Sequence, residues 1–168
     1  GHGLWGYNAR PYAEWCARNR AVRGFGLATS HMYQAIIRRR RAIFDAHPEY
    51  LALVNGERRG AKLCIGNPGL RELVVDYARE YFQTNPDADC LSMDPSDGGG
   101  WCECPDCAAL GSISDQALTL ANTVAETIVH EFPGKYIGLL AYNQHSPPPT
   151  IDVHPNVLVK VQTAFIRG

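Results

Sequence analysis

The second half of the chain alternates helix-patterned and strand-patterned segments, and this alternation limits the fold more than any other feature. Apolar side chains recur at helical spacing along residues 68–84 and 112–131, with the expected caps Asn67-Pro68 and Ser112 at their starts. Short apolar runs typical of buried strands occupy residues 89–93, 136–141 and 157–161. Strands and helices that alternate at this spacing predict a parallel sheet with helices packed outside it.

The first half of the chain adds a strand, a helix and a hairpin to this expectation. Residues 22–29 alternate in bulk, which predicts a strand with His31 at its tip. Residues 34–46 have helical spacing, and their four arginines at 38–41 are interpreted as a solvated stripe, with an anion site as the alternative. Asn55-Gly56 supplies the positive φ of a two-residue turn, so residues 50–63 are expected to form a hairpin.

Polar side chains follow three of the predicted strands, where a parallel sheet places its ligand site. They are His31, the run Asp94 to Asp97, and the run Tyr142 to His145, which includes Asn143. Directly after Asp94 and Asp97 come three glycines and Trp101. A carboxylate that protonates or orients a sugar beside a stacking Trp would use these residue types in this order. The alternative is a flexible acidic turn whose aspartates cap nearby amides.

Cys102, Cys104 and Cys107 form the most specific pattern in the chain, Cys-x-Cys-x-x-Cys. Three thiolates this close can hold one structural zinc, which is tetrahedral and favours sulfur, with His31, His145 or Asp97 as the fourth ligand. A local disulfide, buried thiols or dithiol redox chemistry are the alternatives. The remaining cysteines, Cys16, Cys64 and Cys90, are interpreted as buried thiols, and no organic cofactor is expected.

Composition narrows the classes of partner. The chain has 168 residues, with 16 Lys+Arg against 17 Asp+Glu, so it has no basic surface of the kind that nucleic acid requires. Its apolar runs are only a few residues long, so no membrane span is expected. We expect a piece of a longer protein whose open sheet edges could support a homo-oligomer, and a periplasmic or secreted location rather than a cytoplasmic one.

Several short motifs occur in an order that resembles one bacterial family. They are Trp15 to Arg20, Ser30-His31, Ala46 to Leu53 with Gly56, Leu63 to Pro68, Asn85 to Asp89, Ser96 to Cys107 and Leu140 to Tyr142. The sequence is similar to the bacterial domain of unknown function 4838 over nearly its whole length, although the family often has Gly-His where this chain has Ser30-His31. The resemblance implies kinship with glycoside hydrolases near the α-glucuronidases and β-hexosaminidases. It therefore implies that residues 1–168 are the central part of a (β/α)8 TIM-type barrel.

With this resemblance, we expect a glycoside hydrolase that acts on a complex polysaccharide or glycan. Asp97 is the expected acid or substrate-orienting carboxylate, and Asp94 is the second candidate. The expected substrate-binding side chains are His31, Trp101, Tyr142, Asn143 and His145. Glycosidases need two carboxylates, and the strand end at residues 142–145 offers none. A non-catalytic carbohydrate-binding domain with a structural zinc is therefore the alternative. A zinc hydrolase is disfavoured because catalytic zinc takes mostly His and carboxylate ligands.

Overall fold

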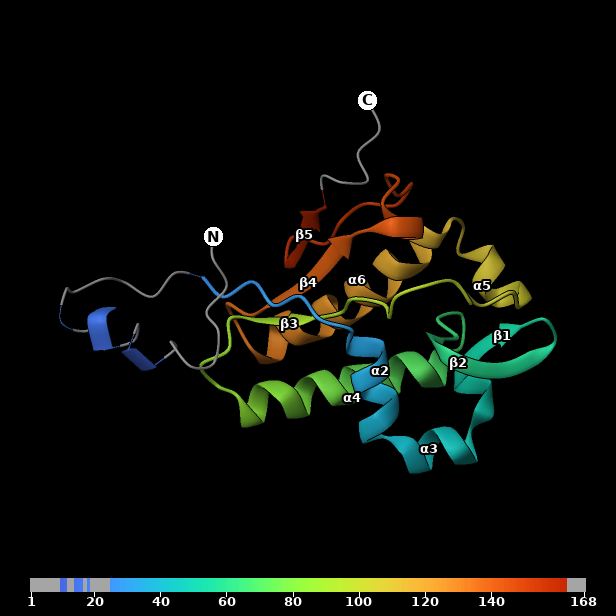
Figure 1. Cartoon of the computed structure of the whole chain (residues 1–168), viewed down its shortest axis with the longest axis horizontal. Coiled ribbons are helices and arrows are strands. Elements are labelled where there is room, and N and C mark those ends of the chain that lie inside the picture. The colour runs from blue at the N-terminus through green and yellow to red at the C-terminus, as the bar shows by residue number, and fades with distance from the viewer. Residues whose placement is uncertain (1–9, 12–13, 17, 19–24, 163–168) are drawn as a thin grey trace.

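The computed structural model describes residues 10–11, 14–16, 18 and 25–162. Residues 10–11, 14–16 and 18 are helical, and α2 (Met32–Arg39) and α3 (Arg41–Ala46) come later in the chain. A hairpin of β1 (Leu51–Val54) and β2 (Glu57–Leu63) follows them (Figure 1). The larger part of the domain is a sheet with two covering helices. It consists of α4 (Pro68–Thr84), β3 (Cys90–Ser92), α6 (Ile113–Glu131), β4 (Tyr136–Ala141) and β5 (Val157–Val161). The short elements are η1 (Pro48–Tyr50), α5 (Pro105–Ala109) and η2 (Asn143–His145).

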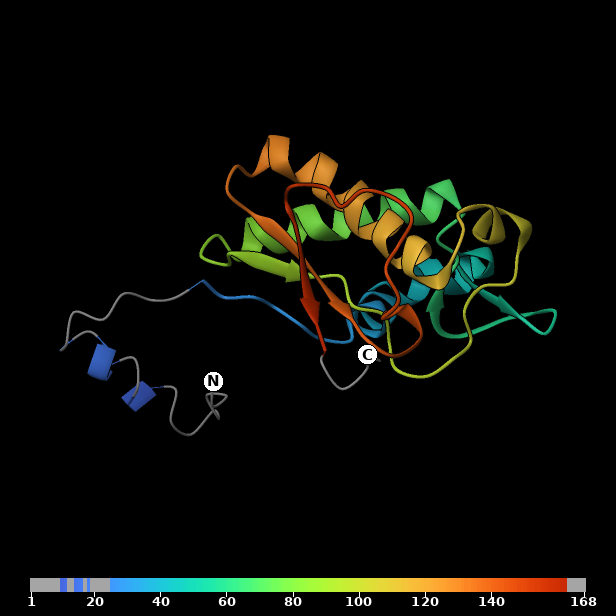
Figure 2. The same cartoon turned by 90° about the horizontal axis from the view of Figure 1, so that it is seen from above.

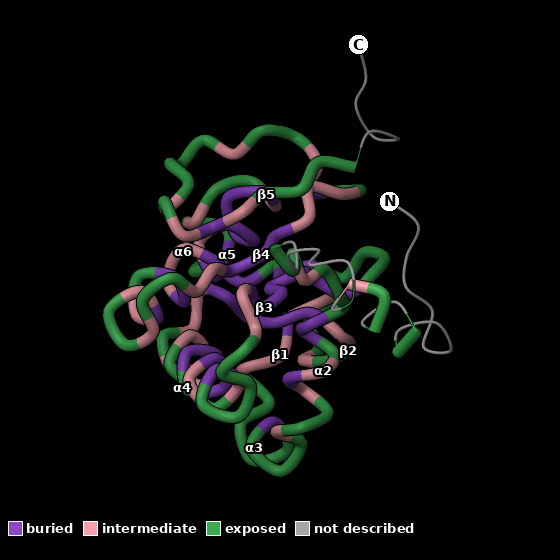
Figure 3. Tube along the Cα trace, turned by 90° about the vertical axis from the view of Figure 1, so that its left-hand side faces the viewer, coloured by how far each residue is buried: buried purple, intermediate pink, exposed green. Residues whose placement is uncertain are grey.

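The alternating half of the chain forms the predicted parallel sheet, with strand order β3-β4-β5. Leu91 pairs with Ile137 across the first ladder, and Gly138 pairs with Leu158 across the second. The helices α4 and α6 pack against each other and cover one face of this sheet (Figure 2). The buried centre of the molecule runs through β3 and β4 (Figure 3).

The expectation of a (β/α)8 barrel is wrong for the described residues. Their five strands divide into an antiparallel pair, β1-β2, and a parallel sheet of three, and the two sheets do not join. A barrel closes only when enough tilted and staggered strands pair into one sheet. The result is a small α/β domain with a hairpin beside the sheet. β5 pairs on one side only within the described part of the chain, so the proposed homo-oligomer stays a prediction.

Local sequence signals placed most elements correctly. Asn67 caps α4 by accepting a hydrogen bond from the Leu70 N–H at 3.2 Å, and Ser112 caps α6 in a capping box with Asp115. Asn55 and Gly56 have φ values of 50° and 79°, as the hairpin turn requires. The expected strand at 22–29 is absent from its described part, residues 25–29, while residues 22–24 lie outside the described ranges.

The single helix predicted for residues 34–46 is divided at Arg40 into α2 and α3. The division accompanies contacts of the arginine run with α4: the Arg39 guanidinium donates to the Tyr77 hydroxyl, and Arg40 pairs with Glu80. Arg41 pairs with Asp45 on its own helix. These partners favour the interpretation of the run as a surface stripe. Among the described residues, no helix is both long and apolar enough to cross a membrane.

Candidate functional site

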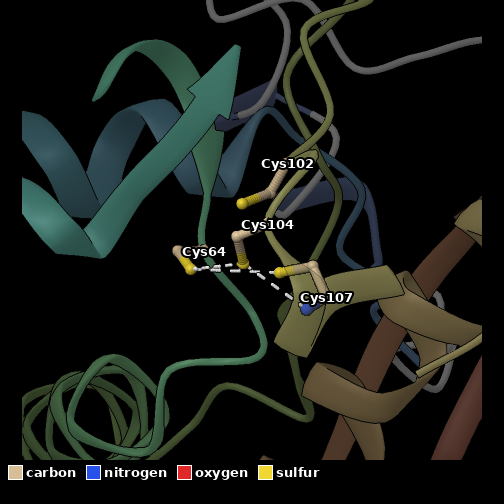
Figure 4. Close-up of side chains that lie close together, drawn as sticks. All are labelled: Cys64, Cys102, Cys104 and Cys107. Carbon is tan, nitrogen blue, oxygen red and sulfur yellow. Dashed lines mark hydrogen bonds between the residues drawn. The ribbon is translucent and has the colours of Figure 1, made fainter. Parts of the chain in front are cut away.

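Four cysteines meet between the hairpin and the segment that follows the three glycines. Cys64 comes directly after β2, Cys102 and Cys104 precede α5, and Cys107 lies within α5. All four are buried, and their sulfur atoms lie within 4.8 Å of one another. The side chains point toward a common centre from two separate parts of the chain (Figure 4). Cys64, which the sequence analysis interpreted as an isolated buried thiol, thus takes the fourth position that we had assigned to His31, His145 or Asp97.

The spacing of the sulfur atoms fits a metal ion better than a disulfide. The Cys64 Sγ lies 3.5 Å from the Cys104 Sγ and 3.9 Å from the Cys107 Sγ. A disulfide requires about 2 Å between its sulfurs. Four thiolates at zinc–sulfur distances of about 2.3 Å would form a tetrahedron with edges of about 3.8 Å. These four residues could therefore hold a metal ion.

Hydrogen-bond donors around the cluster favour thiolate ligands. The Gly66 N–H donates to the Cys107 Sγ at 3.1 Å, and the Leu53 N–H donates to the Cys102 Sγ at 3.3 Å. The Arg58 guanidinium approaches the Cys102 Sγ at 3.8 Å and brings a positive charge to a site that would carry excess negative charge. Such outer contacts orient metal ligands and tune the site.

Hydrogen bonding and burial shift the cysteine pKa values in opposite directions. Hydrogen bonds, first from Cys107 and then from Arg58 and Cys104, lower the pKa of Cys64 to about 5. Burial raises the pKa of Cys102 above its ordinary value. A cation bound by the cluster would favour the thiolate form of its ligands.

Gly66 explains why the hairpin can approach α5 so closely. A Cβ atom at Gly66 would lie 2.6 Å from the Asp106 carbonyl carbon and 2.7 Å from the Cys107 nitrogen. We expect Gly66→Ala to weaken metal binding at least tenfold, on the order of 1.4 kcal/mol, because it pushes Cys64 away from Cys107. Competition with a chromophoric chelator measures this affinity. Gly99→Ala is the matched control, because its Cβ would meet only the Gln144 Oε1 at 3.9 Å. Equal affinities of the two variants would contradict the prediction.

A polar pocket of about 270 Å³ lies beyond the carboxyl ends of β3 and β4. Five residues singled out from the sequence contribute to its wall, which consists of Thr29, Ser30, His31, Asp94, Pro95, Asp97, Leu140, Tyr142 and His145. The structure thus brings His31 together with Asp94, Asp97, Tyr142 and His145, although they come from three distant segments. Whether they bind a ligand stays a prediction.

Asp94 holds the floor of the pocket together. Its carboxylate accepts hydrogen bonds from the Ser30 N–H at 2.8 Å, the Ser92 hydroxyl at 2.9 Å and the Leu140 N–H at 2.6 Å. Burial raises the pKa of Asp94, although these hydrogen bonds act in the opposite direction. Asp94 therefore ties the segment before α2 to β3 and β4, so that its first role is to build the pocket.

Asp97 and His31 face each other at the mouth of the pocket. The Asp97 Oδ2 lies 3.4 Å from the His31 Nε2, and their side chains are 65% and 53% exposed, respectively. The His31 Nδ1 lies 3.5 Å from the Pro95 carbonyl oxygen. Unlike Asp94, the Asp97 carboxylate is open to solvent and can reach a bound molecule.

The other predicted binding residues lie around η2. His145 is buried, with its ring 5.7 Å from Trp101 and 6.4 Å from Tyr142. Burial, together with the charge of Lys62, lowers the pKa of His145 to about 4, so the imidazole is neutral near pH 7. Trp101 is buried behind the pocket rather than in its wall, and Asn143 lines a second, more apolar cavity between α6 and β5.

Sequence analysis missed Lys62, which is only 2% exposed. Its ammonium donates to the Ser96 carbonyl oxygen and lies 5.1 Å from the centre of the Trp101 ring. Lys62 lies in β2, two residues before Cys64. The same strand therefore contacts the cysteine cluster and residues 94–100, which we call the polar-pocket loop. The only signal in the sequence is a lysine in a hairpin, which ordinarily indicates a solvated position.

The fold and the site define a small α/β domain with a cluster of four buried cysteines that could hold a metal ion and a polar pocket beyond the carboxyl ends of a parallel sheet. The family described as Domain of unknown function (DUF4838) matches residues 4–166, and the chain belongs to this family. No curated protein and no solved structure matches the chain. The kinship with glycoside hydrolases that the resemblance implied therefore stays a prediction.

Proposed function

We propose that the four cysteines hold one zinc ion with a structural role. The observation that supports this is the complete set of four buried thiols at spacings suited to tetrahedral coordination. Four thiolates fill the coordination sphere of zinc and leave no position for a reacting water. The ion would fix the hairpin to the segment before α5, where the Glu103 N–H also donates to the Leu53 carbonyl oxygen at 2.9 Å.

We also propose that the polar pocket binds a carbohydrate and that Asp97 acts on it as acid or orienting carboxylate in the hydrolysis of a glycosidic bond. The observation that carries this proposal is the exposed pair of Asp97 and His31 above a pocket whose wall offers further polar groups. Tyr142 and His145 would bind sugar hydroxyls. Trp101, from behind the wall, would support His145.

A non-catalytic carbohydrate-binding domain is the second candidate, and the geometry of Asp94 favours it. The three hydrogen bonds from Ser30, Ser92 and Leu140 engage both carboxylate oxygens of Asp94. Hydrolysis of a glycoside needs a second carboxylate besides the acid. Asp97 is then the only carboxylate in the described wall of the pocket that is not committed to holding the fold.

Asp97→Asn separates these candidates. If the protein is a glycosidase, this variant should lower the rate at which it hydrolyses a 4-nitrophenyl glycoside or oligosaccharide by about 10²-fold or more, the usual contribution of a general acid. The substrate is one that the wild-type protein hydrolyses. In a binding domain, Asp97→Asn should weaken oligosaccharide binding in calorimetry, and the wild-type protein should show no turnover. Asp87→Asn is the matched control, because Asp87 is exposed on the connection at the opposite edge of the sheet. Wild-type behaviour of Asp97→Asn in both assays would refute the assignment of Asp97.

A further inference from the structure

The buried ammonium of Lys62 contacts the segment that presents Asp97. The Lys62 Nζ donates to the Ser96 carbonyl oxygen and lies 3.4 Å from both the Ser96 Oγ and the Asp97 carbonyl oxygen. The Ser96 hydroxyl, in turn, donates to the Ala61 carbonyl oxygen at 2.6 Å. Two neighbouring residues of β2 therefore hold two neighbouring residues of the polar-pocket loop.

A cation in this position is costly unless its hydrogen bonds are satisfied, because burial removes the ammonium from water. Backbone carbonyls and the Ser96 hydroxyl surround Lys62, and the Trp101 ring adds a favourable cation–π contact. An apolar side chain would fill the same position without this cost. The role of the Lys62 ammonium is therefore to form hydrogen bonds that hold the loop in one position, which an apolar side chain could not do.

We infer that Lys62 is a positioning residue for Asp97: its contacts with the Ser96 and Asp97 carbonyls fix the backbone so that the Asp97 carboxylate faces His31. This inference rests on the function proposed for the pocket. The loop continues through Gly98–Gly100, which are exposed and have little around them, to the buried Trp101. Glycines provide no side-chain contacts that could fix Asp97, so its orientation depends on the anchor on its amino-terminal side.

Lys62→Met tests this inference, because it keeps the apolar stem and removes the donors. We expect the imidazole nitrogen resonances of His31 to move to the positions they have in Asp97→Asn, since both variants remove the carboxylate from His31. Lys135→Met is the matched control: the Lys135 ammonium also donates to a backbone carbonyl, that of Pro86, and lies 6.0 Å from the Phe82 ring, at the opposite edge of the sheet. It should leave the His31 resonances unchanged.

A double-mutant cycle supplies the second measurement. For an oligosaccharide that binds the wild-type protein, Lys62→Met should weaken affinity about tenfold, the effect of losing one hydrogen bond to a charged group. Lys62→Met added to Asp97→Asn should cause no further loss, because Lys62 acts through Asp97. Additive losses would overturn the inference. They would assign Lys62 an effect on the pocket that is independent of Asp97.

The test remains decisive even if Lys62→Met misfolds or if the sugar that binds the pocket is not found. Metal content and thermal unfolding show whether Lys62→Met is folded. If it is not, Lys62→Gln keeps an uncharged N–H donor group and should place the His31 resonances between those of the wild type and Asp97→Asn. Wild-type His31 resonances in a folded Lys62 variant would overturn the inference. The nuclear magnetic resonance measurement needs no carbohydrate, so a failure of all tested sugars to bind would count against the proposed function alone.

Discussion

Replacing Cys107 with serine is expected to abolish stoichiometric metal binding and to lower the free energy of unfolding by more than about 4 kcal/mol. Cys107 is fully buried in α5 and lies 3.9 Å, sulfur to sulfur, from Cys64. A hydroxyl is a poor zinc ligand, and the loss of the ion would leave three buried thiols without their common partner. Native mass spectrometry measures the metal content, and urea titration measures the stability.

Cys90→Ser is the control for this prediction. Cys90 is also a buried free thiol, but it lies in β3, outside the cysteine cluster. This variant should retain one metal ion per chain and lose only the stability expected of a buried thiol-to-hydroxyl change. If Cys107→Ser kept its metal and matched the stability of Cys90→Ser, the proposal of a structural metal site at the four cysteines would be wrong.

Asp94→Ala should cause the other large effect, a loss of about 3 kcal/mol of stability, because one unpaired buried donor costs about 1–3 kcal/mol and two further hydrogen bonds to a charged group are lost. It leaves the Leu140 N–H without an acceptor, while the Ser30 N–H and the Ser92 hydroxyl keep only the contacts between Ser30 and Ser92. The segment before α2 would then depend on the backbone bond from Met32 to the Asp94 carbonyl and on the Ser30–Ser92 contacts, so His31 would be less firmly fixed in the pocket. Urea titration measures the loss of stability, and amide exchange of residues 25–31 locates it.

Asp89→Ala provides the comparison for Asp94. Asp89 precedes the same strand and accepts one backbone hydrogen bond, from the Gly26 N–H at 2.9 Å, in a more exposed position. Its loss should cost about 1 kcal/mol, the usual contribution of one hydrogen bond. Similar costs for the two alanine variants would show that Asp94 does not organise the pocket as we describe.

The sequence predicted most elements and the parallel sheet, but it did not predict how many strands that sheet contains. The limits of α4 and α6 follow from caps and apolar spacing within a few residues of each helix, and the hairpin follows from Asn55-Gly56. The number of strands that pair in one sheet depends on contacts between distant segments. Local periodicity carries no information on this number, so the barrel was inferred from the family resemblance alone, and the structure overturned it.

The site shows the same division between local and distant information. Cys102, Cys104 and Cys107 were recognised because one short motif contains them. Cys64 is 40 residues from Cys104, and nothing near it distinguishes a ligand from a core thiol. Lys62 was not predicted for a different reason. Trp101 and the polar-pocket loop, which are remote in the sequence, cover it in the folded chain.

The separation of Cys64 from the other three thiols couples binding of the proposed zinc to folding of the domain. An unfolded chain can capture a metal ion with the three local cysteines alone. Recruiting Cys64 closes a loop of 40 residues that contains all of α4 and β3. Closing a flexible loop of that length costs about 3 kcal/mol of chain entropy. Packing of α4 against α6 can offset this cost, so we expect the proposed zinc to gain its fourth ligand together with the formation of the helical layer.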